Sequence, residues 1–241
     1  MRHPADSRLA LFLVESGFNP SQVARYTGVP RSTINTWIRQ GPPVAARRFI
    51  DPTTVPRVAY AYLLALYLGD GYICRTGRSY RLRIAMDSRY PRIIEEARSA
   101  IDAVLAPNHG GVYRRPSANM VEISGYSNSL LMLFPQHGPG PKHARLIRLE
   151  AWQESIVEEH PGAFLRGLIH SDGCRVTNRV WKGKYEYPRY FFSQVSTDIM
   201  ELFCRTCRQL GIEYRFNGSR SVSIARRASV ARLDVLVGPK T

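Results

Sequence analysis

One helical segment occurs twice in this chain, and both copies end in Asp-Gly. The stretch AYLLALYLGDGYI at 61–73 matches AFLRGLIHSDGCR at 163–175, which makes Asp70 equivalent to Asp172. Small residues recur every four positions in each copy: Ala61, Ala65 and Gly69 in the first, and Ala163, Gly167 and Ser171 in the second. Such stripes allow two helix backbones to touch, so we expect the helices to pack side by side and the two aspartates to converge near a pseudo-twofold axis. Two converging carboxylates require a cation to offset their repulsion.

Each copy resembles the LAGLIDADG motif, whose positions correspond to Leu63–Gly71 and Leu165–Gly173. The resemblance covers residues 57–241 and implies an α+β fold: a pseudo-twofold LAGLIDADG core of two αββαββα-type halves with saddle-shaped antiparallel sheets. In single-chain homing endonucleases of that family, the penultimate aspartate of each motif binds divalent metal, normally Mg²⁺, and the enzyme cuts both strands of duplex DNA. The resemblance therefore implies that Asp70 and Asp172 are metal ligands and catalytic residues. Three positions depart from the motif without removing these acids: Ala65, Leu68 and His170.

A second repeat places a lysine late in each half. Only four of the 34 basic residues are lysines, and two of these, Lys142 and Lys240, follow Gly-Pro. In LAGLIDADG enzymes a basic residue in this part of each half lies beside the metal-bound water. The resemblance therefore implies that both lysines are catalytic. The alternative is that the two Gly-Pro-Lys turns are solvated loops.

The residues between and after the repeats alternate in polarity as strands do. Strands are expected around 72–86 and 111–125 with a helix over 91–105 between them, and the second half repeats this pattern over 175–195, 198–210 and 213–226. Basic side chains recur at every second position, so one sheet face could lie on phosphates, although ordinary half-exposed sheets also carry such charges. The residues expected to bind DNA from these strands and their ends are Arg81, Arg83, Arg175, Arg179, Gln194, Arg226 and Arg227.

Residues 1–41 resemble a bacterial helix-turn-helix domain. Asn19-Pro20 starts one helix, Gly28 permits a turn, and RSTINTWIRQ forms the next helix, after a first helix over 7–16. The expected core is Val23, Ala24, Val29, Ile34, Trp37 and Ile38. The expected DNA-contacting side chains are Arg31, Ser32, Thr33, Asn35, Thr36 and Arg39. A three-helix protein-interaction module is the alternative.

The domain organisation that follows is a helix-turn-helix at 1–41, a proline-rich linker at 42–56, a first half at 57–160 and a second half at 161–241. The net charge of +15 favours a polyanionic partner. We expect double-stranded DNA as the partner, no membrane span, no organic cofactor, a monomer with internal pseudo-twofold symmetry, and a cytoplasmic, nucleoid-associated location. Cys204 and Cys207 lie in a helical pattern and are interpreted as packed thiols, with half of a zinc site as the alternative.

The resemblance implies a Mg²⁺-dependent, sequence-specific DNA endonuclease that hydrolyses phosphodiesters in both strands. The chief alternative is a catalytically silent transcription regulator, because some bacterial regulators fuse a LAGLIDADG-like core to a helix-turn-helix and lack the catalytic residues. Retention of both Asp70 and Asp172 favours the nuclease.

Overall fold

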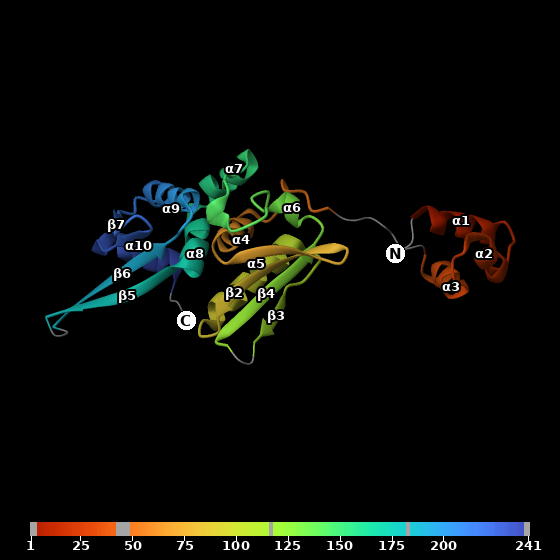
Figure 1. Ribbon diagram of the computed structural model, residues 1–241, viewed down its shortest axis with the longest axis horizontal. Helices are drawn as coiled ribbons and strands as arrows, with labels where there is room; N and C mark the ends of the chain where they lie inside the picture. Colours follow the sequence, from red (N-terminus) through yellow and green to blue (C-terminus); the bar gives the residue numbers. More distant parts are fainter. Residues whose placement is uncertain (1–3, 42–48, 116–117, 182–183, 239–241) are drawn as a thin grey trace. The chain divides into compact units, whose positions relative to one another are not determined.

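The computed structural model describes residues 4–41, 49–115, 118–181 and 184–238. The chain forms two compact units, residues 1–48 and residues 49–241, and each is described by itself (Figure 1). No helix in the described ranges is both long and apolar enough to cross a membrane.

The first unit contains three short helices: α1 (Pro4–Glu15), α2 (Pro20–Thr27) and α3 (Arg31–Gln40). The Asn19 side chain caps α2 by accepting hydrogen bonds from the first turn, and Gly28 ends that helix with a left-handed φ of 67°. The small core comprises Ala10, Val23, Val29, Ile34 and Trp37. Ile38, which was expected in this core, is 46% exposed because the adjacent Trp37 points inward in its place.

The second unit contains two halves that share the order αββαββα, and the first half continues with a 3₁₀ turn and a further helix. The first half comprises α4 (Arg57–Gly69), β1 (Gly71–Thr76), β2 (Ser79–Asp87), α5 (Pro91–Leu105), β3 (Gly111–Arg114), β4 (Met120–Ser127), α6 (Leu130–Leu133), the 3₁₀ turn η1 (Lys142–Ala144) and α7 (Ala151–Glu159). The second half comprises α8 (Pro161–Asp172), β5 (Gly173–Val180), β6 (Tyr185–Ser193), α9 (Thr197–Gln209), β7 (Arg215–Phe216), β8 (Ser221–Ile224) and α10 (Arg227–Val237). Each half has one antiparallel sheet, of order β1-β2-β4-β3 or β5-β6-β8-β7. The predicted α+β fold with internal pseudo-twofold symmetry is therefore confirmed.

Residues 49–56, expected to belong to the linker, are part of the second unit. Val55 is buried, and the Ile50 backbone N–H donates to the Ser129 hydroxyl at 2.8 Å. The linker prediction is wrong for these residues because apolar side chains among the prolines pack on the core. Residues 42–48 lie outside the described ranges.

Helices α4 and α8 pack side by side at the centre of the second unit (Figure 1). A Cβ atom added to Gly167 would lie 2.6 Å from the Ala65 Cβ and 2.6 Å from the Tyr62 carbonyl oxygen. The methyl group of Ala65, where the motif has glycine, is therefore accommodated by a glycine on the opposite helix. Because the backbones approach this closely, the two helices end at the same place.

Candidate catalytic site

The C-terminal ends of α4 and α8 meet at the two aspartates. Asp70 is the C-cap of α4 and Asp172 is the last residue of α8. A Cβ atom on Gly69 would lie 2.2 Å from the Ser171 hydroxyl oxygen and 2.8 Å from Asp172 Oδ2, so the helix ends are in direct contact. Two helix C-termini, each with a partial negative charge, thus add to the charge of two carboxylates. This arrangement strongly favours a bound cation.

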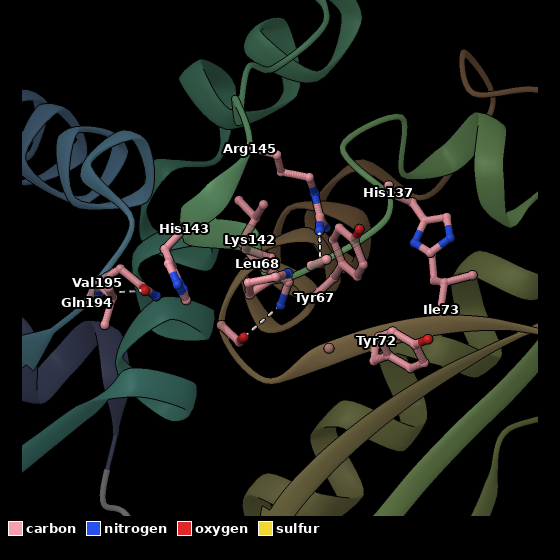
Figure 2. A pocket seen from close by; sticks show the side chains of 15 residues that line it. Tyr67, Leu68, Tyr72, Ile73, His137, Lys142, His143, Arg145, Gln194 and Val195 are labelled. Atoms are coloured by element: carbon pink, nitrogen blue, oxygen red, sulfur yellow. Dashed lines mark hydrogen bonds between the residues drawn. The ribbon is translucent and has the colours of Figure 1, made fainter.

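Lys142, in the 3₁₀ turn η1, extends its side chain toward the ends of α4 and α8. Its Nζ donates to the Gly69 carbonyl oxygen at 2.7 Å and lies 5.1 Å from the centre of the Tyr67 ring (Figure 2). Burial lowers the pKa of the Lys142 amine from 10.5 to about 8, while Asp172 and Asp70 act in the opposite direction and Arg145 lowers it further. The amine therefore lies in the field of both carboxylates, and its catalytic role stays a prediction. Lys240, its expected equivalent, lies outside the described residues.

The side chain of Gln194 contacts the carboxylate of Asp172. Its Oε1 accepts hydrogen bonds from the backbone N–H groups of Val195, at 2.8 Å, and Ser196, at 3.2 Å. These bonds orient the amide, so that Nε2 donates to Asp172 Oδ2 at 2.8 Å. We expected Gln194 to bind DNA, and sequence reasoning missed this contact. The available signal was an amide side chain directly after a strand of the second repeat.

A pocket of about 310 Å³ opens beside the helix ends. Figure 2 shows residues from both halves around it. Its wall includes these basic and hydrogen-bonding side chains: His137, Lys142, His143, Arg145, Tyr72 and Gln194. The pocket places cationic groups beside Gly69 and Gly71, which flank Asp70, so it can hold phosphate oxygens next to a metal ion bound by the carboxylates.

The donor set fits a hard divalent cation. No group of three or more His, Cys, Asp and Glu side chains that could hold a metal occurs in the described part of the chain. Asp70, Asp172 and the main-chain carbonyls at the two helix ends supply only oxygen donors. Oxygen is the ligand that Mg²⁺ and Mn²⁺ prefer, and Mg²⁺ in particular is usually bound through one or two carboxylates together with water and substrate phosphates.

The two arginines of the first sheet that were expected to bind DNA form ion pairs within the protein. Arg81 and Arg83 lie on the face of β2 opposite the core, since Leu82 and Ile84 are buried. Arg81 Nη2 lies 2.6 Å from one carboxylate oxygen of Glu122 and Arg83 Nε lies 2.9 Å from the other. The hydrogen bond from Arg83, together with the positive charges of Arg83 and Arg81, holds the pKa of Glu122 below its ordinary value. The cluster carries one net positive charge rather than two.

The two arginines expected to bind DNA from the second sheet lie on its helix side, and their DNA contact stays a prediction. Arg175 pairs in register with the buried Tyr190 and binds Asp234 of α10 at 2.7 Å, so it lies on the helix side. Arg179 is on the same face and binds Glu186. Because side chains alternate along a strand, the opposite face carries Arg189, whose guanidinium lies 5.7 Å from the Phe191 ring centre.

The remaining expected DNA contacts lie on exposed surfaces. Arg226 binds Glu213 at 2.6 Å, and Arg227 is exposed at the start of α10. On α3 the side chains of Arg31, Ser32, Thr36 and Arg39 are exposed. Thr33 and Asn35 are half-buried.

The two neighbouring cysteines of α9 are packed thiols. Cys204 and Cys207 are buried in the main core, and burial raises the pKa of each thiol. A raised pKa disfavours the thiolate that metal binding requires.

No family model matches the chain. An uncharacterized protein of Methanocaldococcus jannaschii is 25% identical over 178 residues; the match covers 72% of this chain and spans 59% of that protein's length. Among solved structures, I-DmoI in complex with DNA and Mn has a TM-score of 0.51 and 17% identity, covering 77% of this chain and 99% of I-DmoI. Full-length DUF199/WhiA from Thermatoga maritima has a TM-score of 0.44 and 10% identity, covering 78% of this chain and 58% of that protein. The likeness to I-DmoI shows that the second unit has the fold of single-chain LAGLIDADG homing endonucleases.

Proposed function

We propose that the protein is a DNA endonuclease that uses a divalent cation to hydrolyse phosphodiesters in both strands of duplex DNA. One observation carries this proposal. The ends of α4 and α8 touch at Gly69 and Asp172, and the amine of Lys142 lies within the field of Asp70 and Asp172. Paired acids beside a buried lysine are the charges that phosphodiester hydrolysis uses.

In this proposal each residue of the site has a separate role. Asp70 and Asp172 would hold the cation, which when bound supplies a nucleophile of lowered pKa and polarises the scissile phosphate. Lys142 would stabilise the negative charge that develops on the phosphate oxygens. Gln194 would keep the Asp172 carboxylate in one orientation through its bond to Oδ2.

Duplex DNA is the polymer that the surface suits. The net charge of +15 attracts a polyanion, and the sheet faces opposite the core carry Arg81, Arg83 and Arg189. I-DmoI, which shares the fold of the second unit, has been crystallised with DNA and Mn. We infer that the second unit binds DNA as a monomer, with its two halves on the two half-sites.

The first unit supports a second candidate function. The exposed Arg31, Ser32, Thr36 and Arg39 on α3 fit a helix-turn-helix that reads bases and phosphates. A protein with two DNA-binding units could regulate transcription without cutting. The nuclease requires Asp70 and Asp172 for cleavage, whereas a regulator that does not cut would need them only for folding.

Cleavage of a randomised duplex library with Mg²⁺ or Mn²⁺ tests the proposal. Asp70→Asn and Asp172→Asn should each abolish cleavage and largely keep DNA binding, because binding depends on the basic surfaces. Glu201→Gln, which removes an exposed charge on α9, is the control. Cleavage by either asparagine variant at the wild-type rate would refute the site. Specific binding without cleavage by the wild type would establish the regulator.

A further inference from the structure

The faces of the two sheets that lie opposite the core can be compared position by position. The repeat makes Gly71 equivalent to Gly173, so their strand partners, Ile84 of β2 and Phe192 of β6, are equivalent too. Strands β2 and β6 pair in turn with β4 and β8, which extends the comparison by one strand. On the faces opposite the core, four positions therefore correspond: Arg81 with Arg189, Arg83 with Phe191, Glu122 with Ser221, and Ser124 with Ser223.

On the first sheet, a buried carboxylate holds two arginines in place. Glu122 is 5% exposed and accepts from Arg81 Nη2 at 2.6 Å and from Arg83 Nε at 2.9 Å. Both arginine side chains remain half-buried, so part of each guanidinium faces solvent. A guanidinium that is already held loses less conformational freedom on binding, and its remaining N–H groups match the O6 and N7 acceptors of guanine.

The second sheet lacks this cluster. Phe191 stands at the position of Arg83, and Ser221 stands at the position of Glu122. Because one arginine and the glutamate are both replaced, each face keeps one net positive charge at the four corresponding positions. The two faces therefore attract phosphates equally at these positions and differ in the side chains that they offer to base edges.

Aromatic side chains form a row along the outer face of β6. Tyr185, Tyr187 and Phe191 alternate with residues that point toward the core, and the rings of Tyr185 and Tyr187 stack with centroids 6.4 Å apart. Tyr187 is 49% exposed, and Val176 on the neighbouring strand is 38% exposed. The ring of Phe191 has no donor for guanine, but aromatic carbon can contact the C5-methyl group that thymine presents in the major groove.

We propose that the two halves recognise half-sites of different composition. Arg81 and Arg83 of the first half donate to guanine, whereas Tyr187 and Phe191 of the second half contact thymine methyl groups. This inference rests on the proposed binding of duplex DNA by the second unit, and it concerns recognition rather than cleavage. The DNA target is then asymmetric, with G·C pairs beneath the first sheet and A·T pairs beneath the second.

Exchange of the two chemistries between the sheets tests the proposal. The full-length protein selects duplexes from a randomised library with Ca²⁺ in place of Mg²⁺, and only uncut duplex is recovered and sequenced. Phe191→Arg combined with Ser221→Glu rebuilds the cluster of the first sheet on the second, where Arg189 already occupies the position of Arg81. This double variant should select guanine in place of thymine in one half-site and leave the rest of the selected sequence unchanged.

The reciprocal variant, Arg83→Phe combined with Glu122→Ser, is the matched control. It should lose guanine from the other half-site and keep the thymines that the wild type selects. Circular dichroism of both variants establishes that each is folded.

Uracil substitution tests the same contacts with the wild-type protein alone, so its result does not depend on the folding of a variant. Replacing thymine by uracil in the selected site removes only the C5-methyl group. The Kd measured by gel shift should rise about fourfold for each contacted methyl group, at the positions that the first double variant changes. Substitution in the other half-site should leave the Kd unchanged.

An unchanged Kd after uracil substitution in both half-sites would overturn the proposal. Selection of the wild-type sequence by the folded variant with Phe191→Arg and Ser221→Glu would overturn it as well, and either result would leave the proposed nuclease standing. Thymine contacts in a wild-type protein that binds but does not cut would support this inference and refute the nuclease. The absence of any selected sequence would overturn both.

Discussion

Lys142 combines a favourable position for chemistry with an unfavourable one for stability. Burial lowers the pKa of its amine from 10.5 to about 8, so the protonated form is disfavoured in the folded state. This penalty is fully present below pH 8 and is relieved as the pH rises toward 10.5, where the unfolded chain also loses the proton.

Replacing this amine should therefore stabilise the protein while impairing catalysis. Lys142→Met should raise the free energy of unfolding at pH 7 by about 2 kcal/mol. Removing the buried charge recovers the free energy that the lowered pKa represents, and this exceeds the free energy lost with one hydrogen bond. The gain should shrink at pH 9. Urea unfolding at both pH values checks it, with Lys184→Met at an exposed position as the control. An equal gain at both pH values would show that charge burial is not its cause.

Gln194 contacts Asp172, so in the proposed reaction it would act by positioning that carboxylate. Gln194→Met keeps the side-chain volume but removes the donor to Asp172 Oδ2, so cleavage should fall about 10-fold to 100-fold while DNA affinity stays near the wild-type value. The apparent affinity for Mn²⁺, measured by titrating cleavage, should fall as well. A large loss of DNA affinity with normal cleavage at saturation would return Gln194 to the DNA-binding role first expected.

At the scale of elements, the contact between α4 and α8 leaves no room for an added methyl group at Gly167. Gly167→Ala places a methyl group 2.6 Å from backbone and side-chain atoms of α4, so the helices must separate. We expect a loss of about 1–3 kcal/mol in unfolding free energy, together with reduced cleavage. Gly111→Ala is the control, because its added Cβ would meet nothing closer than 3.8 Å. Similar unfolding midpoints for the two variants would contradict close packing of the helices.

The strands show how the position of a residue in the strand alternation decides which sheet face its side chain occupies. In β5, Arg175 pairs with Asp234 of α10, and Arg179 on the same face pairs with Glu186 of β6, whereas in β2 the side chains of Arg81 and Arg83 lie on the face opposite the core. Alternation along a strand is visible in the sequence, but two faces alternate equally well. Only packing against a helix shows which face is covered.

At the scale of the whole molecule, the two units should contribute separately to DNA binding. Deleting residues 1–48 should leave the second unit folded, because it has its own core. Affinity should fall and the nuclease footprint should shorten, since a tethered module adds effective concentration. Circular dichroism and footprinting of the truncated protein measure both effects. A footprint of unchanged length would count against the first unit as a DNA reader.

The sequence by itself determined the architecture and the central acids. The small-residue stripes, the paired Asp-Gly ends and the repeated strand pattern sufficed for two equivalent halves with Asp70 and Asp172 at their junction, because helix contacts follow from local periodicity. The rarity of lysine and the repeated turn singled out Lys142, whose amine contacts the end of α4. The place of Lys240 stays a prediction.

Only the tertiary structure decided the partners of the polar side chains. Gln194 binds Asp172 across 22 residues of sequence, Glu122 pairs with both arginines of β2, and Arg175 pairs with Asp234 on a helix at the end of the chain. Charges and hydrogen bonds act at short range between residues distant in sequence, so their pairing depends on register and on which face each element covers.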